Sequence, residues 1–151
     1  ILSRQDVIDL PSVSGDRKAD SKGLLKGGYV VLPEQDAEVI LVANGSEVSL
    51  LCEVSEELKL QGIKSQVVSV PSLGNYLMQS AEYKESVIPT GKKVFGLTAG
   101  VPSTLYPIMK GDFKVYGLER FGASAPYKVL DEKFGYTKSN ILAEIKQFLG
   151  K

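Results

Sequence analysis

The sequence predicts an α/β protein, a three-layer sandwich in which helices cover both faces of a mostly parallel β-sheet. Short β-branched runs, such as residues 38–43 and 66–70, alternate with longer stretches whose apolar residues recur at helical spacing. The run at 38–43 is apolar at every position after Glu38, which is typical of a strand covered by helices on both faces. A strand, a helix and a second strand in this order form a right-handed βαβ unit.

Length and composition indicate one globular domain. The chain has 151 residues, of which 43% are hydrophobic and 24% are charged, so it can form a packed core. No apolar run approaches the roughly 18 residues that cross a bilayer. Eighteen basic residues balance 18 acidic ones, so no bulk charge points to nucleic acid or a membrane surface as a partner.

The chain contains no histidine and a single cysteine, Cys52. This composition excludes Ser-His-Asp and Cys-His catalysis, the common zinc sites and an intrachain disulfide. Because there are no paired cysteines, we expect a cytoplasmic protein. The sequence also begins at Ile1 without an initiator methionine, and we expect a piece excised from a longer protein.

The elements can be assigned in order along the chain. Residues 6–26 are polar and turn-rich without sustained periodicity, which indicates an arm or linker. Residues 28–33 form a short apolar run that is stopped by Pro33, and this favours a strand at the edge of the sheet.

The clearest unit is a βαβ unit that begins with the strand at 38–43. Ser46 can cap the following helix, and Gly62 stands where a glycine ends one. The second strand covers residues 66–70 and is closed by Pro71.

The rest of the chain repeats the pattern more loosely. Two further strands are expected at residues 94–97 and 115–118. Pro126 favours the start of a helix that Gly135 ends, and a final amphipathic helix ends at Gly150.

Residues 43–47 follow a strand and open a helix, where doubly wound folds bind phosphate groups on free backbone amides. Of the dinucleotide glycine pattern only Gly45 is present, and the carboxylate of Glu47 would repel an anion. A plain helix cap is therefore favoured over a phosphate site.

Residues 121–126 place Ser124 between Gly122 and Pro126, but this is not the nucleophile pattern G-x-S-x-G, and no histidine exists to take the proton. A tight turn followed by a helix cap at Ser124 explains the segment better.

Acidic and aromatic side chains offer weaker candidates. Glu82, Glu85 and Glu119 remain as candidate bases by elimination, although none has a partner at a spacing that indicates a catalytic pair. Glu82 and Glu85 fit a solvated helix face. Cys52 fits a small core residue. Half-buried packing is also favoured over a base-stacking role for four tyrosines, Tyr76, Tyr83, Tyr106 and Tyr116.

Several segments together resemble the C-terminal domain of transketolases. They keep the order and approximate spacing of that family over essentially the whole chain. The matching segments are residues 2–5, 26–30, 40–48, 67–72, Gln79, 83–89, 120–126 (Arg-Phe-Gly-Ala-Ser-Ala-Pro) and the pair Phe134-Gly135.

The resemblance implies a five-stranded sheet whose first strand is antiparallel to the others. It divides the chain into residues 1–26, the end of a preceding domain and a linker arm, and residues 27–151, the transketolase C-terminal domain. It implies an enzyme of the pentose phosphate pathway that transfers a two-carbon ketol unit between phosphorylated sugars. Thiamine diphosphate and a divalent metal, Mg or Ca, would be bound by the preceding domains, and the parent would be a homodimer.

This chain would then have a structural and interface role, with no cofactor and no catalysis of its own. One site residue is carried over by the resemblance. Arg4 in the Ser-Arg-Gln segment matches the arginine that contacts the phosphate group of the sugar, and a guanidinium can bond two phosphate oxygens at once. The alternative is an arginine in an exposed surface pair.

Some positions depart from the family pattern. Thr98 replaces a glutamate that commonly follows the fourth strand, and no tryptophan follows it. The region near Leu73-Gly74 lacks a frequent acidic residue. Two alternatives stay open: the matching domain of another thiamine enzyme, dihydroxyacetone synthase or the β chain of a 2-oxo acid dehydrogenase, and a freestanding module that binds a nucleotide near Asn44.

Overall fold

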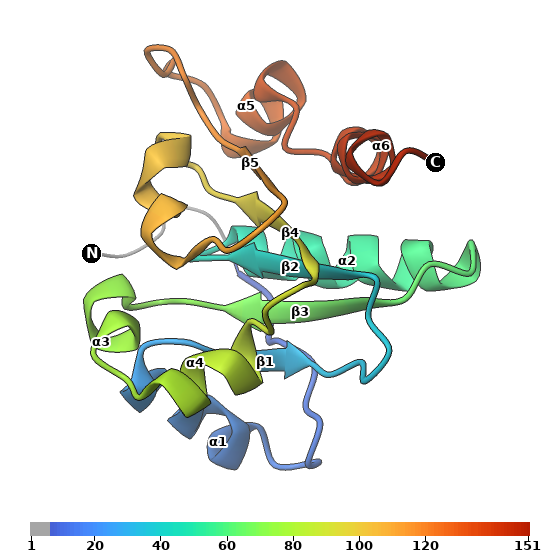
Figure 1. The fold of residues 1–151 in the computed structure, drawn as a ribbon. Helices are drawn as coiled ribbons and strands as arrows, with labels where there is room; N and C mark the ends of the chain where they lie inside the picture. Colours follow the sequence, from blue (N-terminus) through green and yellow to red (C-terminus); the bar gives the residue numbers. More distant parts are fainter. Residues whose placement is uncertain (1–6) are drawn as a thin grey trace.

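A computed structural model describes residues 7–151 of the chain, which form a single five-stranded sheet with helices on both faces (Figure 1). The strands lie in the order β1-β3-β2-β4-β5. Strand β1 pairs antiparallel with β3, and all other neighbours are parallel. The strands are β1 (Tyr29–Leu32), β2 (Val39–Ala43), β3 (Ser65–Ser69), β4 (Lys93–Leu97) and β5 (Phe113–Tyr116). The predicted mixed sheet with an antiparallel first strand at its edge is confirmed.

Helices connect the strands and follow the last one. Two short elements precede the sheet, α1 (Arg17–Asp20) and the 3-10 helix η1 (Ser21–Lys26). The others are α2 (Glu47–Leu60), α3 (Leu73–Leu77), α4 (Ala81–Val87), η2 (Pro102–Thr104), η3 (Tyr106–Ile108), α5 (Tyr127–Phe134) and α6 (Lys138–Leu149). Within residues 7–151, none of these helices is long and apolar enough to cross a membrane.

The core consists of two apolar layers separated by the sheet. Val39, Leu41 and Ala43 of β2 point into the layer beneath α2 and α6. Ile40 and Val42 point to the other face, where they pack with residues of α4 and η3. This alternation explains why the run is apolar at successive positions, and it confirms the three-layer prediction.

Glycines end three helices as the sequence predicted. Gly62, Gly135 and Gly150 each have a positive φ, of 76°, 77° and 76°, which a side chain rarely adopts. Ser46 precedes the first residue of α2, but the expectation that its side chain caps the helix is wrong. Its hydroxyl donates to Oε1 of Glu47 at 2.8 Å and makes no hydrogen bond that caps the helix.

Two further expectations need correction. The strand expected at 115–118 lies at 113–116, because the chain turns away at Gly117, where a Cβ would lie 2.7 Å from the carbonyl oxygen of Gly100. The arm expected at 6–26 contains α1 and η1, which are too short to produce a visible period. Asp20 fixes the turn before them by accepting hydrogen bonds from Ser12 Oγ at 2.7 Å and the Val13 amide at 3.0 Å.

Gly27 joins the arm to the domain at a point where no side chain fits. Its φ is 83°, and a Cβ there would lie 2.3 Å from the amide nitrogen of Tyr76 and 2.4 Å from the carbonyl oxygen of Ser72. The Gly27 carbonyl in turn accepts a hydrogen bond from the Ser72 amide at 3.0 Å. The start of β1 is therefore held directly against the start of α3.

We predict that Gly27→Ala destabilises the protein much more than Gly111→Ala. Both glycines have a positive φ, which costs an L-residue roughly 1–2 kcal/mol, but a Cβ at Gly111 would meet no atom within 4 Å. Overpacking at Gly27 adds about 1–3 kcal/mol. Urea unfolding measures both losses, and equal losses would contradict the close backbone approach.

Candidate functional site

The carboxyl ends of β2 and β4 lie side by side, and the chain leaves them in opposite directions. From β2 it passes through α2 to β3 on one side, whereas from β4 it passes to β5 on the other. In open α/β sheets such a switch point leaves a crevice in which ligands bind. Asn44 and Gly45 follow β2 at this point, and Thr98 and Ala99 follow β4.

A cavity of about 240 Å³ opens at this edge, and we call it the switch-point cavity. Its walls come from the start of α2, from α5 and Tyr136, which lies two residues beyond the end of α5, and from the arm. The lining residues are Ile8, Ser46, Glu47, Ser49, Leu50, Glu53, Tyr127, Asp131 and Tyr136.

Two side chains of helix α5 reach the cavity because of their spacing along the helix. Tyr127 and Asp131 are four residues apart and so share one face of the helix. Gly135 then ends the helix in the left-handed conformation, and the amide of Tyr136 donates back to the Asp131 carbonyl at 2.8 Å. This turn brings the Tyr136 ring to the cavity beside Asp131.

Two of the carboxyl groups in the cavity, those of Glu47 and Asp131, are partly removed from water. Burial raises the pKa of Glu47, and the negative charge of Asp131 adds to the shift, while the hydrogen bond from Ser46 opposes it. Burial also raises the pKa of Asp131. Two carboxyl groups that disfavour their charged forms therefore face the same space.

Tyr136 is fixed and uncharged. Its hydroxyl donates to the Thr98 carbonyl at 2.8 Å, and burial raises its pKa to about 12. Its ring meets that of Tyr116 edge-on with centroids 5.6 Å apart. The Tyr136 hydroxyl therefore links the end of β4 to the end of α5. With this pKa it is not a base at neutral pH.

This arrangement does not suit a phosphate group. None of the nine lining residues is basic, and three of them carry carboxyl groups. The nucleotide-binding alternative near Asn44 is therefore not favoured. Within the described part of the chain, no three His, Cys, Asp or Glu side chains gather in a way that could hold a metal ion.

The segment at 121–126 is an exposed loop. Phe121 is 97% exposed, and Pro126, not Ser124, precedes the first residue of α5. The expected cap at Ser124 is wrong, since no side chain caps this helix. Pro126 supplies an extended residue whose carbonyl begins the helical hydrogen bonds instead.

The acidic candidates are surface residues. Glu85 accepts hydrogen bonds from the amide of Thr90 at 2.6 Å and its hydroxyl at 2.7 Å, and pairs with Lys110 at 3.2 Å. Glu82 is exposed in the first turn of α4, and Glu119 is exposed in the loop after β5. These positions support the interpretation as solvated groups.

The tyrosines and the cysteine mainly hold the fold together. Tyr76 is buried, Tyr83 donates to the Gly28 carbonyl at 2.7 Å, and Tyr116 donates to the Phe134 carbonyl at 2.8 Å. Tyr106 is the exposed member of the group, at 48%. Cys52 is buried as expected, and burial raises its pKa to about 11, which keeps the thiol protonated and unreactive.

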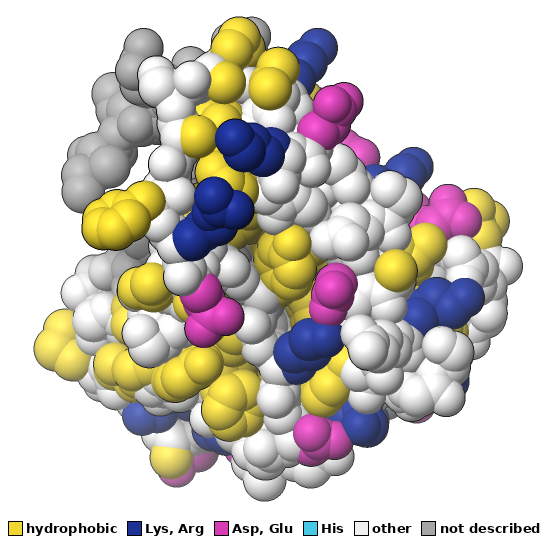
Figure 2. Space-filling view, turned by 90° about the horizontal axis from the view of Figure 1, so that it is seen from above, with side chains coloured by type: hydrophobic (Ala, Val, Ile, Leu, Met, Phe, Trp, Pro, Cys, Tyr) yellow, Lys and Arg dark blue, Asp and Glu magenta, His cyan; other side chains and the backbone are white. Residues whose placement is uncertain are grey.

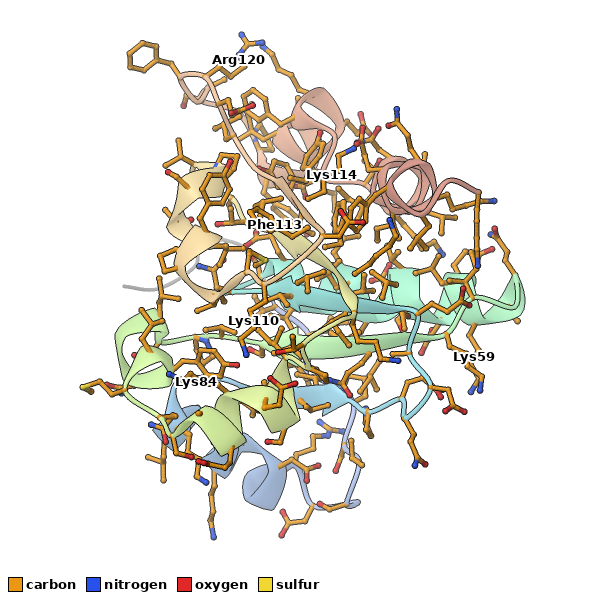
Figure 3. The ribbon with its side chains drawn as sticks, viewed as in Figure 1. Lys59, Lys84, Lys110, Phe113, Lys114 and Arg120 are labelled. Carbon is orange, nitrogen blue, oxygen red and sulfur yellow. The ribbon has the colours of Figure 1, made fainter. Side chains whose placement is uncertain are left out.

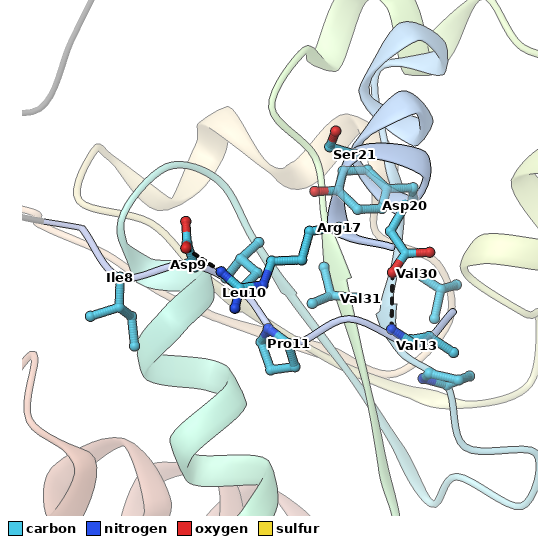
Figure 4. A pocket seen from close by; sticks show the side chains of 12 residues that line it. Ile8, Asp9, Leu10, Pro11, Val13, Arg17, Asp20, Ser21, Val30 and Val31 are labelled. Atoms are coloured by element: carbon cyan, nitrogen blue, oxygen red, sulfur yellow. Dashed lines mark hydrogen bonds and ion pairs between the residues drawn. The ribbon is translucent and has the colours of Figure 1, made fainter. Parts of the chain in front are cut away.

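A larger cavity of about 580 Å³ lies between the arm and the outer side of β1 (Figure 4). Leu10, Val30 and Val31 contribute apolar walls. Its charged groups serve the arm itself, because Arg17 pairs with Asp9 and Asp20 accepts from the Val13 amide. The cavity is a product of how the arm folds back along the sheet edge.

Arg4, the one site residue expected from the sequence, lies outside the described residues. The structure instead brings together Glu47, Asp131 and Tyr136, of which sequence reasoning singled out only Glu47. The spacing of Tyr127 and Asp131 was a usable signal, because it places both on one helix face. Nothing local indicates that this face meets α2.

We predict that the stability gained by Glu47→Gln over the wild type grows as the pH rises. The pKa of Glu47 is raised on folding, so its favourable contribution is present at low pH and is lost as the pH rises through the folded pKa. The variant does not titrate and escapes this loss. Chemical unfolding from about pH 4 to about pH 7 measures the difference.

Glu82→Gln is the matched control for this series. Its own backbone amide and Ser80 lower the pKa of Glu82, so the sign is reversed, and this variant should lose stability relative to the wild type as the pH rises. The same trend in both variants would show that the cavity does not disfavour the Glu47 charge.

The chain matches known proteins along almost its whole length. Residues 27–137 match the family model of the transketolase-like C-terminal domain. The chain is 38% identical to the transketolase of Staphylococcus epidermidis over 148 residues, 97% of the chain, and 40% identical to that of Halalkalibacterium halodurans over 155 residues, 99% of the chain. It spans about a fifth of the length of these relatives, 22% of each.

A solved structure agrees with these matches. The transketolase of Pichia stipitis in complex with sedoheptulose-7-phosphate superposes with a TM-score of 0.77 at 31% identity, covering 93% of this chain and 20% of that one. Sequence and fold thus point to the same part of the same enzyme. The chain belongs to the transketolase family and corresponds to its C-terminal domain.

Proposed function

We propose that this chain acts as the C-terminal domain of a transketolase, within an enzyme that transfers a two-carbon ketol unit between phosphorylated sugars. The observation that carries the proposal is the match of nearly the whole chain to about a fifth of curated transketolases. In this proposal the domain supports the catalytic parts of the enzyme and contributes one substrate contact.

Catalysis resides elsewhere in the proposed enzyme. The chain has no histidine, and its single cysteine is buried with a raised pKa, so it supplies neither an imidazole base nor a reactive thiolate. Thiamine diphosphate, with Mg or Ca, would supply the carbanion chemistry on preceding domains. The role of this chain is to present surfaces to those domains and to a second subunit of a homodimer.

Arg4 is the proposed contact with the substrate phosphate. Its planar guanidinium can donate to two phosphate oxygens together. The described chain begins at the carboxyl edge of the sheet, where Ile8 lines the switch-point cavity. Four residues of extended chain span at most about 14 Å, so a phosphate held by Arg4 would lie near this edge.

The proposal includes a domain boundary and a compartment. Residues 1–26 are the end of the preceding domain and its linker arm, and residues 27–151 are the C-terminal domain; the direct packing of Gly27 against the start of α3 supports this boundary. A single cysteine without a disulfide partner in the chain suits the cytoplasm.

We predict that Arg4→Ala raises KM for phosphorylated sugars roughly 10- to 100-fold in a transketolase that carries this chain as its C-terminal part. A hydrogen bond to a charged group is worth about 1.5–3 kcal/mol, which corresponds to this range. For unphosphorylated sugars the change should stay below about threefold. Steady-state kinetics with both kinds of substrate measure the difference.

Arg17→Ala is the control, because Arg17 is an exposed arginine of the arm that pairs with Asp9. It should leave both KM values unchanged. Equal effects of Arg4→Ala on the KM values of both kinds of substrate would show that Arg4 does not contact the substrate phosphate.

We also predict that the isolated chain shows no saturable binding of sugar phosphates in calorimetry up to millimolar concentration. Millimolar affinity already requires about −4.1 kcal/mol, more than one charged hydrogen bond supplies. The switch-point cavity adds no positive charge. Sub-millimolar binding would contradict this division of roles.

A further inference from the structure

Exposed apolar side chains gather at the edge where the parallel strands end. Beyond the arm, large exposed hydrophobic residues follow β3, β4 and β5 in turn. We define five of them as the carboxyl-edge patch: Leu77, Met78, Val101, Phe121 and Tyr127. Figure 2, seen from above, shows hydrophobic side chains gathered along its left side, the side on which β2, β3 and β4 end in Figure 1.

Phe121 is the most exposed member of the patch, at 97%. It sits in a stretch, residues 119–129, in which every residue is exposed. The loop is nevertheless oriented, because the Arg120 guanidinium lies 5.8 Å from the centroid of the Phe134 ring at the end of α5. A single exposed ring is common on protein surfaces, whereas several exposed apolar side chains on one edge mark a surface that a partner covers.

Helix α5 has the same character. None of its residues is buried. Tyr127, at its start, is 38% exposed, and Val129 is 51% exposed. A helix of a lone globular domain normally buries an apolar stripe against the core. The apolar side chains at the start of α5 continue the surface around the loop.

The position of the chain entry indicates what covers this surface. The described chain begins with Val7 and Ile8, which are 60% and 64% exposed, and Ile8 lines the same cavity as Tyr127. In curated transketolases the matched part is 22% of the length, so more than three quarters of the enzyme lies outside it. A C-terminal domain is preceded by that larger part, which would approach from this edge.

The described residues at the opposite edge of the sheet expose fewer large apolar side chains. Phe113 is 40% exposed at the start of β5, where its ring packs with that of Tyr106 at 5.7 Å. Leu60 is 82% exposed at the end of α2, with polar Lys59 and Gln61 on either side. Figure 3 shows Arg120 at the projecting loop and Lys59 at the far end of the molecule. Leu60 is therefore a matched exposed residue outside the patch.

We propose that the carboxyl-edge patch, with Phe121 as its anchor, is the surface on which the thiamine-binding part of a transketolase docks. The partner surface is apolar and contains a hollow that accepts a phenyl ring. The inference rests on the proposed function and adds to it the face of the domain that is covered. Large buried aromatic rings commonly dominate such contacts.

The test compares the 151-residue chain alone with a chimera in which it replaces the matched segment of the Halalkalibacterium halodurans transketolase. Amide hydrogen exchange of residues 119–129 should slow at least about tenfold in the chimera, while exchange near Leu60 stays unchanged. Unchanged exchange at 119–129 would overturn the proposal. Equal slowing at both edges would overturn it as well.

A second measurement uses binding in trans. The chain is titrated into the same transketolase lacking its matched segment, and Phe121→Ala should weaken binding roughly tenfold or more, whereas Leu60→Ala should change it less than twofold. Absence of binding by the unmodified chain, or equal effects of the two variants, would count against the docking surface. Self-association of the chain that Phe121→Ala abolishes would assign the patch to a second copy instead.

These outcomes are separable from those of the proposed function. Exchange and binding require neither sugar nor turnover, so protection at 119–129 in a chimera without ketol transfer would uphold docking and overturn the function. A chimera that turns over sugars without protection at 119–129 would do the reverse.

Discussion

Strand β2 lies at the centre of the sheet with all five of its side chains buried, so both of its faces need a covering layer. Its odd and even positions enter two separate apolar clusters. Since β2 also needs a neighbour on each side, β3 pairs along one edge and β4 along the other. The three layers, the parallel pairing and the switch point between β2 and β4 all follow from the burial of this one strand.

Much of the fold could be predicted because the relevant signals are local. The apolar run of β2, the helical period of α2 and the glycines that end helices each act within a few residues of their own position. The predictions are wrong where a contact between residues distant in sequence, or between neighbouring side chains, determines the local structure. Strand β5 ends early because Gly117 passes close to Gly100, and Ser46 bonds to the Glu47 carboxylate in place of the helix amides.

The candidate site was less accessible to sequence reasoning for the same reason. The sequence placed Glu47 at the start of a helix after a strand, and the structure agrees. The pKa shift of Glu47, however, depends on burial, to which α5 and Tyr136 contribute, and on the charge of Asp131, and no local pattern reveals these contacts between residues distant in sequence. Tyr136 reaches Thr98 only because Gly135 reverses the chain after α5.

The carboxyl edge of this domain therefore carries two surfaces of different chemistry. The switch-point cavity is lined by three carboxyl groups and no basic side chain, which disfavours an anion such as a sugar phosphate. Around the cavity, the loops after β3, β4 and β5 present apolar side chains that suit protein contact. These two surfaces fit the proposed role, in which the domain supports a neighbour's active site. In that proposal the phosphate contact comes from outside the cavity, from the guanidinium of Arg4, which has the required charge.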